Sequence, residues 1–412
     1  MNWRQQFYPG MVNVTMKRKG EERTMSSFAS VLPAGVRKVV AQFNKQGVAL
    51  FAVGGCVRDF LLCKTPKDFD FTTGADIETI RQLLEAAGGT VYPLGEKFGT
   101  VCAAIDGEVV EITRFRSDVY DGVTRKPVVT AATSINDDLQ RRDFTINAIA
   151  IELDGNEAVV DPFGGRNDLV AMRLRTPMAA LQTFQDDPLR VLRAIRFVVR
   201  DGFKADAEVT EAIPQVADLL GTVVSRERIL SELEKIIVGS GVELGIYSAC
   251  EVLGELRRLG LLTAVFGSSF DSVAAAKAFG VAHEWGLPQL RDDELMDLVV
   301  GGFVSYGADS DKLKVSRTMA RTATQLQRFA RSDELDRAVL AVKAETPFVT
   351  MAAVVSGCTW QQVKRFRMLS AMAVVFPFNG DTFVNEGIRG PEVGRLLRIS
   401  ERSFVAGILS TM

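Results

Sequence analysis

The sequence predicts an α+β fold, with a small mixed-sheet head followed by an all-helical neck, body and tail. Residues 28–160 alternate short apolar runs, such as Val48–Val53, with helical patterns, such as Ile77–Ala87. Beyond residue 160 the recurring patterns are helical. The chain of 412 residues is too long for one ordinary core, and 47% apolar with 24% charged residues is a globular composition. We therefore expect several subdomains.

Composition excludes several classes of protein. No apolar run reaches the roughly 18 residues that span a bilayer, so a membrane protein is not expected. Five cysteines without a Cys-x-x-Cys pair, and a single histidine, argue against a zinc cluster and favour a reducing, cytoplasmic location. The net charge of −2 does not by itself predict a nucleic-acid-binding protein, although basic residues can still gather on one face.

The same patterns predict where the chain divides. Residues 1–27 lack the apolar core of a signal peptide and are expected to be a poorly ordered extension. The predicted head is 28–160, the neck 161–240, and the body and tail 241–412. Helices are expected at 32–47, 57–62 and 77–87, and strands at 48–53, 90–94, 100–105 and 109–115.

Two glycines end the first predicted strand. Phe51–Val53 leads directly into Gly54 and Gly55, where no side chain shields the backbone N–H groups. A short helix containing Arg58 follows, and a helix N-terminus favours an anion. A Gly-Gly pair alone ordinarily marks a turn. Here an acidic pair follows soon after, so the glycines predict a phosphate site.

The acidic pair is Asp68 and Asp70, which alternate with Phe69 and Phe71. A period of two places both carboxylates on one face of a strand and both rings on the other. Neighbouring carboxylates repel each other, and a divalent metal removes that repulsion. Ligands of this kind suit Mg²⁺ bound together with substrate phosphates, although Asp-x-Asp in isolation is ordinarily solvated acid.

Glu111 places a carboxylate in the otherwise apolar strand 109–115, where an unpaired buried charge is expensive. If this strand lies beside the acidic pair, Glu111 can orient an attacking hydroxyl or complete the metal site. The alternative is an ion pair with Arg114 or Arg116. Residues 116–140 then form a polar segment of little periodicity, expected to be a mobile functional loop or disorder.

A second motif, Arg141–Ala150, begins with two adjacent arginines. Arg141 and Arg142 repel each other unless an anion faces them, and arginine suits bidentate phosphate contacts. Asp143 and Asn147 are four residues apart, so a helix would present both on one face to a ribose hydroxyl or a base.

Together these motifs resemble those of class II tRNA nucleotidyltransferases, the family of CCA-adding enzymes and bacterial poly(A) polymerases. Asp161–Gly165 resembles the family's third motif, a joint between head and neck. Thr183–Phe197 resembles the fourth and Ser225–Arg228 the fifth. The resemblance is specific over residues 51–235 and thin beyond them. It implies that the predicted mixed-sheet domain is a nucleotidyltransferase head.

The resemblance also implies roles for single residues. Asp68 and Asp70 would hold two Mg²⁺ ions, and Glu111 is the further catalytic candidate. The implied nucleotide-binding residues are Gly54, Gly55, Arg58, Arg141, Arg142, Asp143, Asn147, Asp186, Asp187 and Arg190.

The last three of these would read the incoming base. A carboxylate accepts from the exocyclic amine of C or A, and a guanidinium donates to the ring acceptors beside it. Many relatives carry Glu where this chain has Asp186. Asp187 and Arg190 are three residues apart, so one helix face would carry both, and an ordinary i,i+3 ion pair is the plain alternative.

The implied activity is template-independent addition of CCA to the tRNA 3′ end from CTP and ATP, with the body and tail holding the acceptor arm. A CC-adding or A-adding specialist shares every catalytic motif, and the 116–140 segment favours an enzyme able to add A. Poly(A) polymerases usually carry a basic tail, whereas this chain ends in the neutral Leu409–Met412. A catalytically dead RNA-binding protein would not need the acids. The sequence does not predict the oligomeric state.

Overall fold

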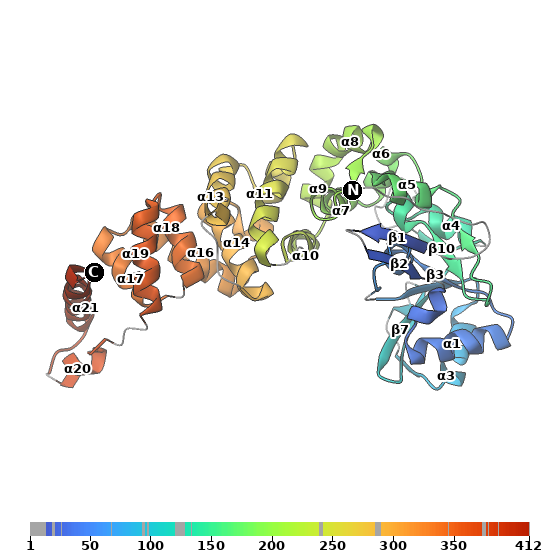
Figure 1. Ribbon diagram of the computed structural model, residues 1–412, viewed down its shortest axis with the longest axis horizontal. Coiled ribbons are helices and arrows are strands. Elements are labelled where there is room, and N and C mark those ends of the chain that lie inside the picture. The colour runs from blue at the N-terminus through green and yellow to red at the C-terminus, as the bar shows by residue number, and fades with distance from the viewer. Residues whose placement is uncertain are drawn as a thin grey trace. The chain divides into compact units, whose positions relative to one another are not determined.

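The computed structural model describes residues 14–18, 21–25, 27–66, 68–92, 95–96, 99–119, 128–132, 134–238, 242–284, 290–344, 346–372, 376–377, 379–385 and 387–411. By its internal contacts the chain divides into two compact units. The first is Met1–Val198 with Gly202–Val216, and the second is Val199–Asp201 with Ala217–Met412. The first unit, blue to green in Figure 1, carries the strands, and the described elements of the second are helices.

A seven-stranded mixed sheet organises the first unit, with the strand order β11-β10-β3-β4-β7-β6-β5. The strands are β3 (Leu50–Val53), β4 (Asp70–Thr73), β5 (Thr90–Tyr92), β6 (Thr100–Ile105), β7 (Glu108–Arg114), β10 (Ala150–Glu152) and β11 (Val159–Val160). β4 and β7 run parallel, and the other neighbours are antiparallel. The predicted α+β fold, with a mixed-sheet head and a helical remainder, is confirmed.

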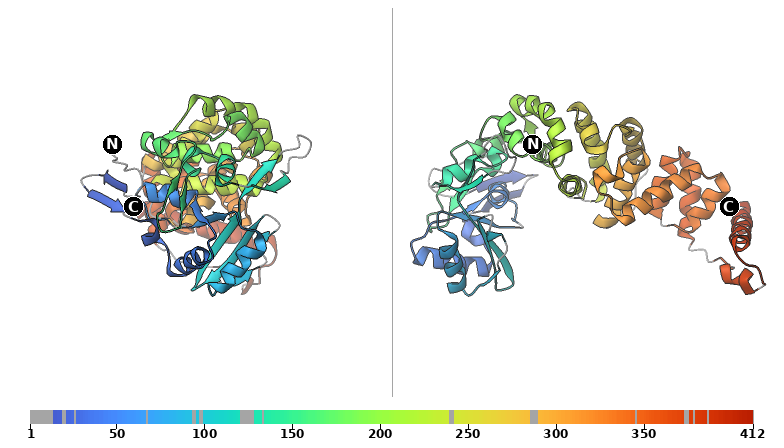
Figure 2. Two further views of the ribbon diagram at one scale, coloured as in Figure 1. Left: turned by 90° about the vertical axis from the view of Figure 1, so that its right-hand side faces the viewer. Right: turned by 180° about the vertical axis from the view of Figure 1, so that it is seen from behind.

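Two amphipathic helices cover this sheet. α1 (Ala34–Lys45) and α3 (Ile77–Ala86) contact each other and several strands, and they lie side by side in Figures 1 and 2. Their apolar residues are buried at the helical spacing that the sequence shows, for example Val39 and Phe43 in α1 and Leu84 in α3. This packing forms the core beneath the site described below.

The segment 116–140 contains regular structure where an irregular loop was expected. β8 (Arg116–Val119) and β9 (Val128–Ala131) pair antiparallel, and α4 (Ile135–Gln140) follows. Ser134 begins α4, because its hydroxyl accepts from the N–H of Asp137 at 3.3 Å. Residues 120–127 lie outside the described part of the chain. The short helix is missed by periodicity because it spans only 6 residues.

The expected N-terminal extension contains a hairpin. β1 (Val14–Arg18) and β2 (Glu21–Met25) pair antiparallel, and residues 1–13 lie outside the described part of the chain. The 3-10 helix η1 (Phe28–Val31) follows. Glu157 anchors its start, because its carboxylate accepts from the backbone N–H groups of Phe28 and Ala29, both at 2.7 Å.

The rest of the first unit is made of short helices and one pair of parallel strands. These elements are α2 (Gly55–Leu61), η3 (Thr145–Asn147), α5 (Gly165–Ala171), β12 (Arg173–Leu174), α6 (Ala180–Asp186), α7 (Arg190–Val199), β13 (Lys204–Ala205), α8 (Ala207–Ala212) and η4 (Ile213–Val216).

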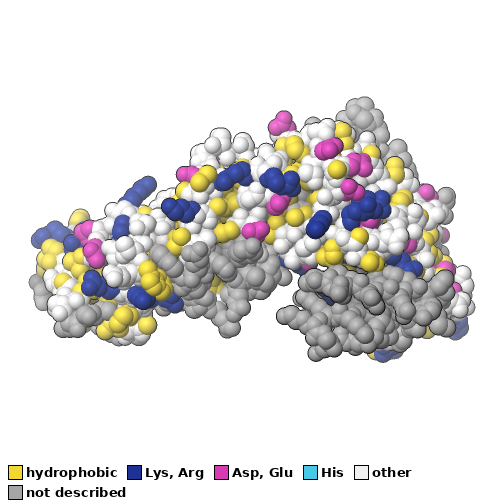
Figure 3. Space-filling view, turned by 45° about the horizontal axis from the view of Figure 1, so that its top comes forward, with side chains coloured by type: hydrophobic (Ala, Val, Ile, Leu, Met, Phe, Trp, Pro, Cys, Tyr) yellow, Lys and Arg dark blue, Asp and Glu magenta, His cyan; other side chains and the backbone are white. Residues whose placement is uncertain are grey.

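The second unit is a succession of helices that pack mainly on near neighbours in the chain. They are α9 (Ala217–Val223), α10 (Arg226–Ile237), α11 (Val242–Arg258), α12 (Leu262–Phe266), α13 (Ser272–Glu284), α14 (Asp292–Ser305), α15 (Ser310–Leu313), α16 (Arg317–Arg331), α17 (Glu334–Val342), α18 (Thr346–Val355), α19 (Trp360–Ala371), α20 (Gly380–Asn385) and α21 (Pro391–Thr411). Ser225 caps α10, because its hydroxyl accepts from the N–H of Arg228 at 3.4 Å. Within the described segments, every helix is too short or too polar to span a lipid bilayer. On the face drawn in Figure 3, Lys and Arg side chains form several separate groups.

Candidate active site

The predicted glycine turn lies where three of the predicted motifs meet. β3 ends at Val53, and Gly54 adopts φ +76° and ψ −131°, a backbone region that favours glycine. A Cβ atom on Gly54 would lie 2.9 Å from Arg142 Nη1 and 3.8 Å from an Asp70 carboxylate oxygen. The glycine turn, the arginine motif and the acidic pair therefore converge on one point.

The acidic residues lie at the edge of β4, between β3 and β7. Asp70 is the first residue of β4, opposite Val53 on one side and Glu111 on the other. Asp68, Asp70 and Glu111 are all exposed. The prediction that both aspartates lie within one strand is corrected for Asp68, which precedes β4, because the pairing with β3 ends at the Val53–Asp70 pair.

Aromatic rings hold this segment in place. Phe69 and Phe71 lie with ring planes 6° apart and centroids 6.5 Å apart, as expected for residues on one side of the chain. Phe28 meets Phe69 edge-on at 6.2 Å and Phe60 of α2 at 5.1 Å. η1, α2 and the acidic segment thus share one aromatic cluster.

Negative charge accumulates around Asp70. The pKa of its carboxyl is raised above the usual range, chiefly because the surrounding protein displaces water even though the side chain keeps solvent access. Arg142 opposes this shift, whereas Glu111 and Asp68 add to it. Cys102 lies on β6, opposite Glu111 of β7. Burial and the charge of Glu111 raise the pKa of its thiol. A cation at this edge would relieve the repulsion.

The carboxylates fit a divalent ion that takes part of its shell from a substrate. Among the described residues, no group of three or more His, Cys, Asp or Glu side chains forms a complete metal site. The available donors are the oxygens of Asp68 and Asp70, with Glu111 in register beside them. Magnesium is typically held by one or two carboxylates plus water and substrate phosphates, so an incomplete protein ligand set is the expected arrangement.

The paired arginines face an anion inside the protein, Asp138. Arg141 Nη2 lies 2.8 Å from one carboxylate oxygen of Asp138, and Arg142 Nη2 lies 3.0 Å from the other. Asp138 was not predicted as a site residue. The signal that could have found it is its spacing, three and four residues before the two arginines, which one turn of helix brings together.

The other predicted nucleotide-binding residues form a continuous chain of contacts. Arg58 donates through Nη1 to Asn147 Oδ1 at 2.8 Å, and its guanidinium carbon lies 5.3 Å from the centre of the Phe197 ring. Asn147 Nδ2 donates to Asp143 at 2.9 Å, and Arg193 Nε donates to the other oxygen of Asp143 at 2.7 Å. Arg193 is a further unpredicted member, because it lies 50 residues along the chain.

Asp143 is buried and ionised. Burial alone would raise its pKa, but the charge of Arg193 and the hydrogen bonds from Asn147 and Arg193 outweigh burial and lower the pKa to about 2. The expected helix face does not form, because η3 covers only Thr145–Asn147 and the Asp143 carboxylate bonds the N–H of Phe144. Such local side-chain bonds compete with helix formation.

The predicted base-reading residues lie at the junction of α6 and α7. α6 ends at Asp186, and Arg190 begins α7. Asp187 lies between these helices and its carboxylate accepts from the N–H of Leu189 at 3.2 Å, so the prediction of a shared helix face with Arg190 is corrected. Arg190 donates through Nη2 to the carbonyl of Arg141 at 2.6 Å, which joins this junction to the arginine motif.

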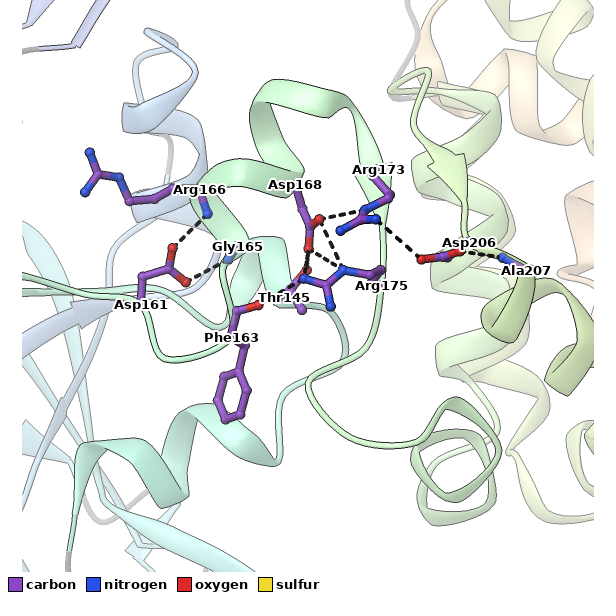
Figure 4. A network of polar contacts seen from close by, with 10 residues as sticks. All are labelled: Thr145, Asp161, Phe163, Gly165, Arg166, Asp168, Arg173, Arg175, Asp206 and Ala207. Carbon is purple, nitrogen blue, oxygen red and sulfur yellow. Dashed lines mark hydrogen bonds and ion pairs between the residues drawn. The ribbon is translucent and has the colours of Figure 1, made fainter. Parts of the chain in front are cut away.

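The Asp161–Gly165 motif joins the sheet to the helices that follow. Figure 4 shows Asp161 accepting from the N–H groups of Gly165, at 2.7 Å, and Arg166, at 2.9 Å. It also shows Asp168, which is buried and is bonded by Thr145, Arg173 and Arg175. A Cβ atom on Gly165 would lie 2.1 Å from the carbonyl oxygen of Thr145, so only glycine allows this approach.

Comparison with known proteins agrees with this geometry. Residues 50–175 match the profile of the poly A polymerase head domain. This match covers less than half of the chain. The nucleotidyltransferase family of CCA-adding enzymes generally uses divalent metal ions.

Individual relatives point the same way. The chain is 37% identical over 202 residues to the CCA-adding enzyme of Geobacillus kaustophilus (strain HTA426), which covers 49% of this chain and 48% of the relative. The chain thus spans about half the length of the curated relatives that it matches.

Solved structures in the nucleotidyltransferase family cover more of the chain. The Bacillus stearothermophilus CCA-adding enzyme in complex with CTP aligns with a TM-score of 0.65 and 25% identity over 91% of this chain and 94% of its own. The Thermotoga maritima CCA-adding enzyme complexed with tRNA-CCA aligns with a TM-score of 0.70 and 18% identity over 92% of this chain and 93% of its own. The second likeness concerns the fold.

Proposed function

We propose that this chain is a template-independent nucleotidyltransferase that adds CCA to the tRNA 3′ end from CTP and ATP. One observation carries the proposal: exposed acids at Asp70 and Glu111 lie in register beside a glycine turn that Arg142 approaches. Repelling acids next to a glycine turn with an arginine beside it suit nucleotidyl transfer. The relatives named CCA-adding enzyme, including one solved with CTP, favour this substrate class.

In this proposal Asp68 and Asp70 hold Mg²⁺. The ions would lower the pKa of the primer 3′-hydroxyl and stabilise the charge of the triphosphate and leaving pyrophosphate. Glu111 would orient the attacking hydroxyl from the neighbouring strand. The raised pKa of Asp70 supports this assignment, because a group that is destabilised as an anion gains from a bound cation.

The triphosphate would lie against Gly54, Gly55 and Arg142. Arg142 Nε is buried and has no hydrogen-bond partner among the described residues, so a phosphate oxygen could satisfy it. Arg141 lies beside it on the same carboxylate, Asp138, and adds positive charge.

The nucleoside would be held by the residues that follow. Asp143 and Asn147 are assigned to the ribose. Arg58, which donates to Asn147, is assigned to the phosphates together with the glycine turn. Asp186, Asp187 and Arg190 are assigned to the base. The bond from Arg190 to the Arg141 carbonyl supports this, because it ties the proposed base reader to the proposed phosphate site.

The helical remainder would bind the RNA. We assign residues 28–160 to the catalytic head, 161–240 to the neck and 241–412 to the body and tail that hold the acceptor arm, with residues 1–27 as an extension. The groups of Lys and Arg in Figure 3 support phosphate contacts that position RNA without reading its sequence. The five free cysteines favour a cytoplasmic setting.

Incorporation into defined transcripts tests the activity. Purified protein with Mg²⁺ would receive tRNA transcripts ending before CCA, after C and after CC, with CTP and ATP separately and together. Completion of all three to CCA is expected. Stopping at CC, adding only the last A, or extending a long A tail would assign a CC-adding enzyme, an A-adding enzyme or a poly(A) polymerase instead. No incorporation, with tRNA binding retained, would favour an RNA-binding protein.

A further inference from the structure

Asp138 is a fully buried carboxylate of the first unit. It lies on α4, its side chain has 0% exposure, and the preceding residue Asp137 remains partly exposed and contacts the capping Ser134. An ionised side chain buried to this extent is costly unless cations surround it. Neighbouring cations must therefore stabilise the Asp138 carboxylate in its buried position.

Two guanidinium groups surround Asp138. Arg141 donates to Oδ1 through Nε at 3.2 Å and Nη2 at 2.8 Å, and Arg142 donates to Oδ2 through Nη2 at 3.0 Å. Burial would raise the pKa of Asp138, but the charges of Arg142 and Arg141 and their hydrogen bonds lower it. Two guanidinium groups share this one carboxylate, and Arg142 also interacts electrostatically with Asp70. The two arginines still have donors for a further anion.

The bond to Asp138 leaves part of Arg142 directed toward the glycine turn. Its Nη2 is held by Asp138, while Nη1 is the atom nearest to the space above Gly54 and Nε is buried without a partner among the described residues. A guanidinium is a rigid plane, so fixing one nitrogen largely fixes the directions of the other two. Asp138 thus determines where the unused donors of Arg142 point.

We propose that Asp138 is a positioning residue that aims Arg141 and Arg142 at the triphosphate of the incoming nucleotide. It touches no substrate itself. This inference rests on the proposed function, because it deepens the phosphate-binding part of the same site. Without this role, Asp138 would be only the acidic partner in a structural ion pair with Arg141 and Arg142.

The test compares Asp138→Asn with the matched control Asp137→Asn, which makes the same change one residue earlier on α4. Losing the charge that aligns two arginines should raise the KM for CTP about tenfold, as expected for one charged hydrogen bond, with a smaller change in kcat. Inhibition by inorganic triphosphate should weaken by a similar factor. The KM for tRNA should stay unchanged, and the control should behave as wild type.

Folding and function are separated by two further measurements. Asp138→Glu keeps the charge and moves it by one methylene. This variant should fold even if Asp138→Asn does not, and it should still raise the KM for CTP because the arginines are displaced. Equilibrium binding of CTP and of inorganic triphosphate to folded protein measures the effect even if the wild type incorporates nothing. Wild-type affinity for both ligands in either folded variant would overturn the inference, as would a loss confined to kcat.

Discussion

The first unit contains two contrasting sets of carboxylates. Asp68, Asp70 and Glu111 are exposed at the edge of the sheet. Asp138, Asp143 and Asp168 are buried, and arginines bond each of them. The pKa of Asp70 is raised, whereas the pKa values of all three buried acids are lowered.

The contrast separates acids that lack a cation from acids that already have cationic partners within the fold. A buried acid that already has cationic partners stabilises the fold, and removing it leaves those cations unpaired. An exposed acid with acidic neighbours contributes little to stability and gains most from a cation supplied by a ligand. The two sets should therefore respond to mutation in opposite ways.

The largest expected effect is on activity at the exposed set. Asp70→Asn should lower the rate of nucleotide incorporation about a thousandfold, the upper range for removing one electrostatic group from a reaction centre. The free energy of unfolding should stay the same or rise slightly, because the charged form of Asp70 is disfavoured in the folded protein. Initial rates and urea unfolding of the same preparation measure both. A rate near wild type would remove Asp70 from the reaction.

The buried set should show the reverse. Asp143→Ala leaves Arg193 without its carboxylate and should reduce the free energy of unfolding by about 3 kcal/mol. Urea unfolding of this variant beside Asp68→Ala, an exposed acid, gives the comparison. Equal losses of stability in the two variants would contradict the distinction between the sets.

The pH dependence of stability sharpens the assignment of Asp143. Its folded pKa of about 2 lies below the ordinary value of about 3.9, so its contribution is complete above pH 4 and is lost as the pH falls toward 2. The difference in unfolding free energy between wild type and Asp143→Asn should therefore shrink, by about 2 kcal/mol, between pH 5 and pH 2. A constant difference across that range would show that the charge is not responsible.

The smallest expected effect comes from the glycine turn. Gly54→Ala and Gly99→Ala both place alanine at a positive φ, +76° and +77°, at a cost of about 1–3 kcal/mol each. Only at Gly54 would the new Cβ also meet Arg142, because at Gly99 no atom of the described residues, chain neighbours aside, lies within 4 Å of it. Both variants should lose stability, but only Gly54→Ala should raise the KM for CTP. Equal KM values would exclude the contact with Arg142.

Local patterns in the sequence predict much of this site. The glycine turn and the alternation of Phe69 and Phe71 each depend on neighbouring residues, and the structure has both. The sequence could not predict that Glu111 lies beside Asp70, because strand pairing joins residues that are far apart in the chain. The role of Glu111 could therefore be stated only on the condition that the two strands are neighbours.

The parts that escaped prediction depend on distant contacts. The end of β3 sets where β4 begins, which leaves Asp68 outside the strand. Arg193 pairs with Asp143 across 50 residues, and no periodicity reports such a pair. Asp138 escaped because the short helix α4 gives too few residues for a recognisable pattern.

Binding of a divalent cation tests the central contrast most directly. Mn²⁺, as a paramagnetic substitute for Mg²⁺, would be titrated in the presence of CTP into wild type, Asp70→Asn and Asp168→Asn, each under conditions where it is folded. We expect Asp70→Asn to lose the bound ion while Asp168→Asn, which changes a buried acid outside the proposed nucleotide site, retains it despite lower stability. Undiminished binding by Asp70→Asn, or loss only in Asp168→Asn, would contradict the assignment of the metal ion to the exposed acids.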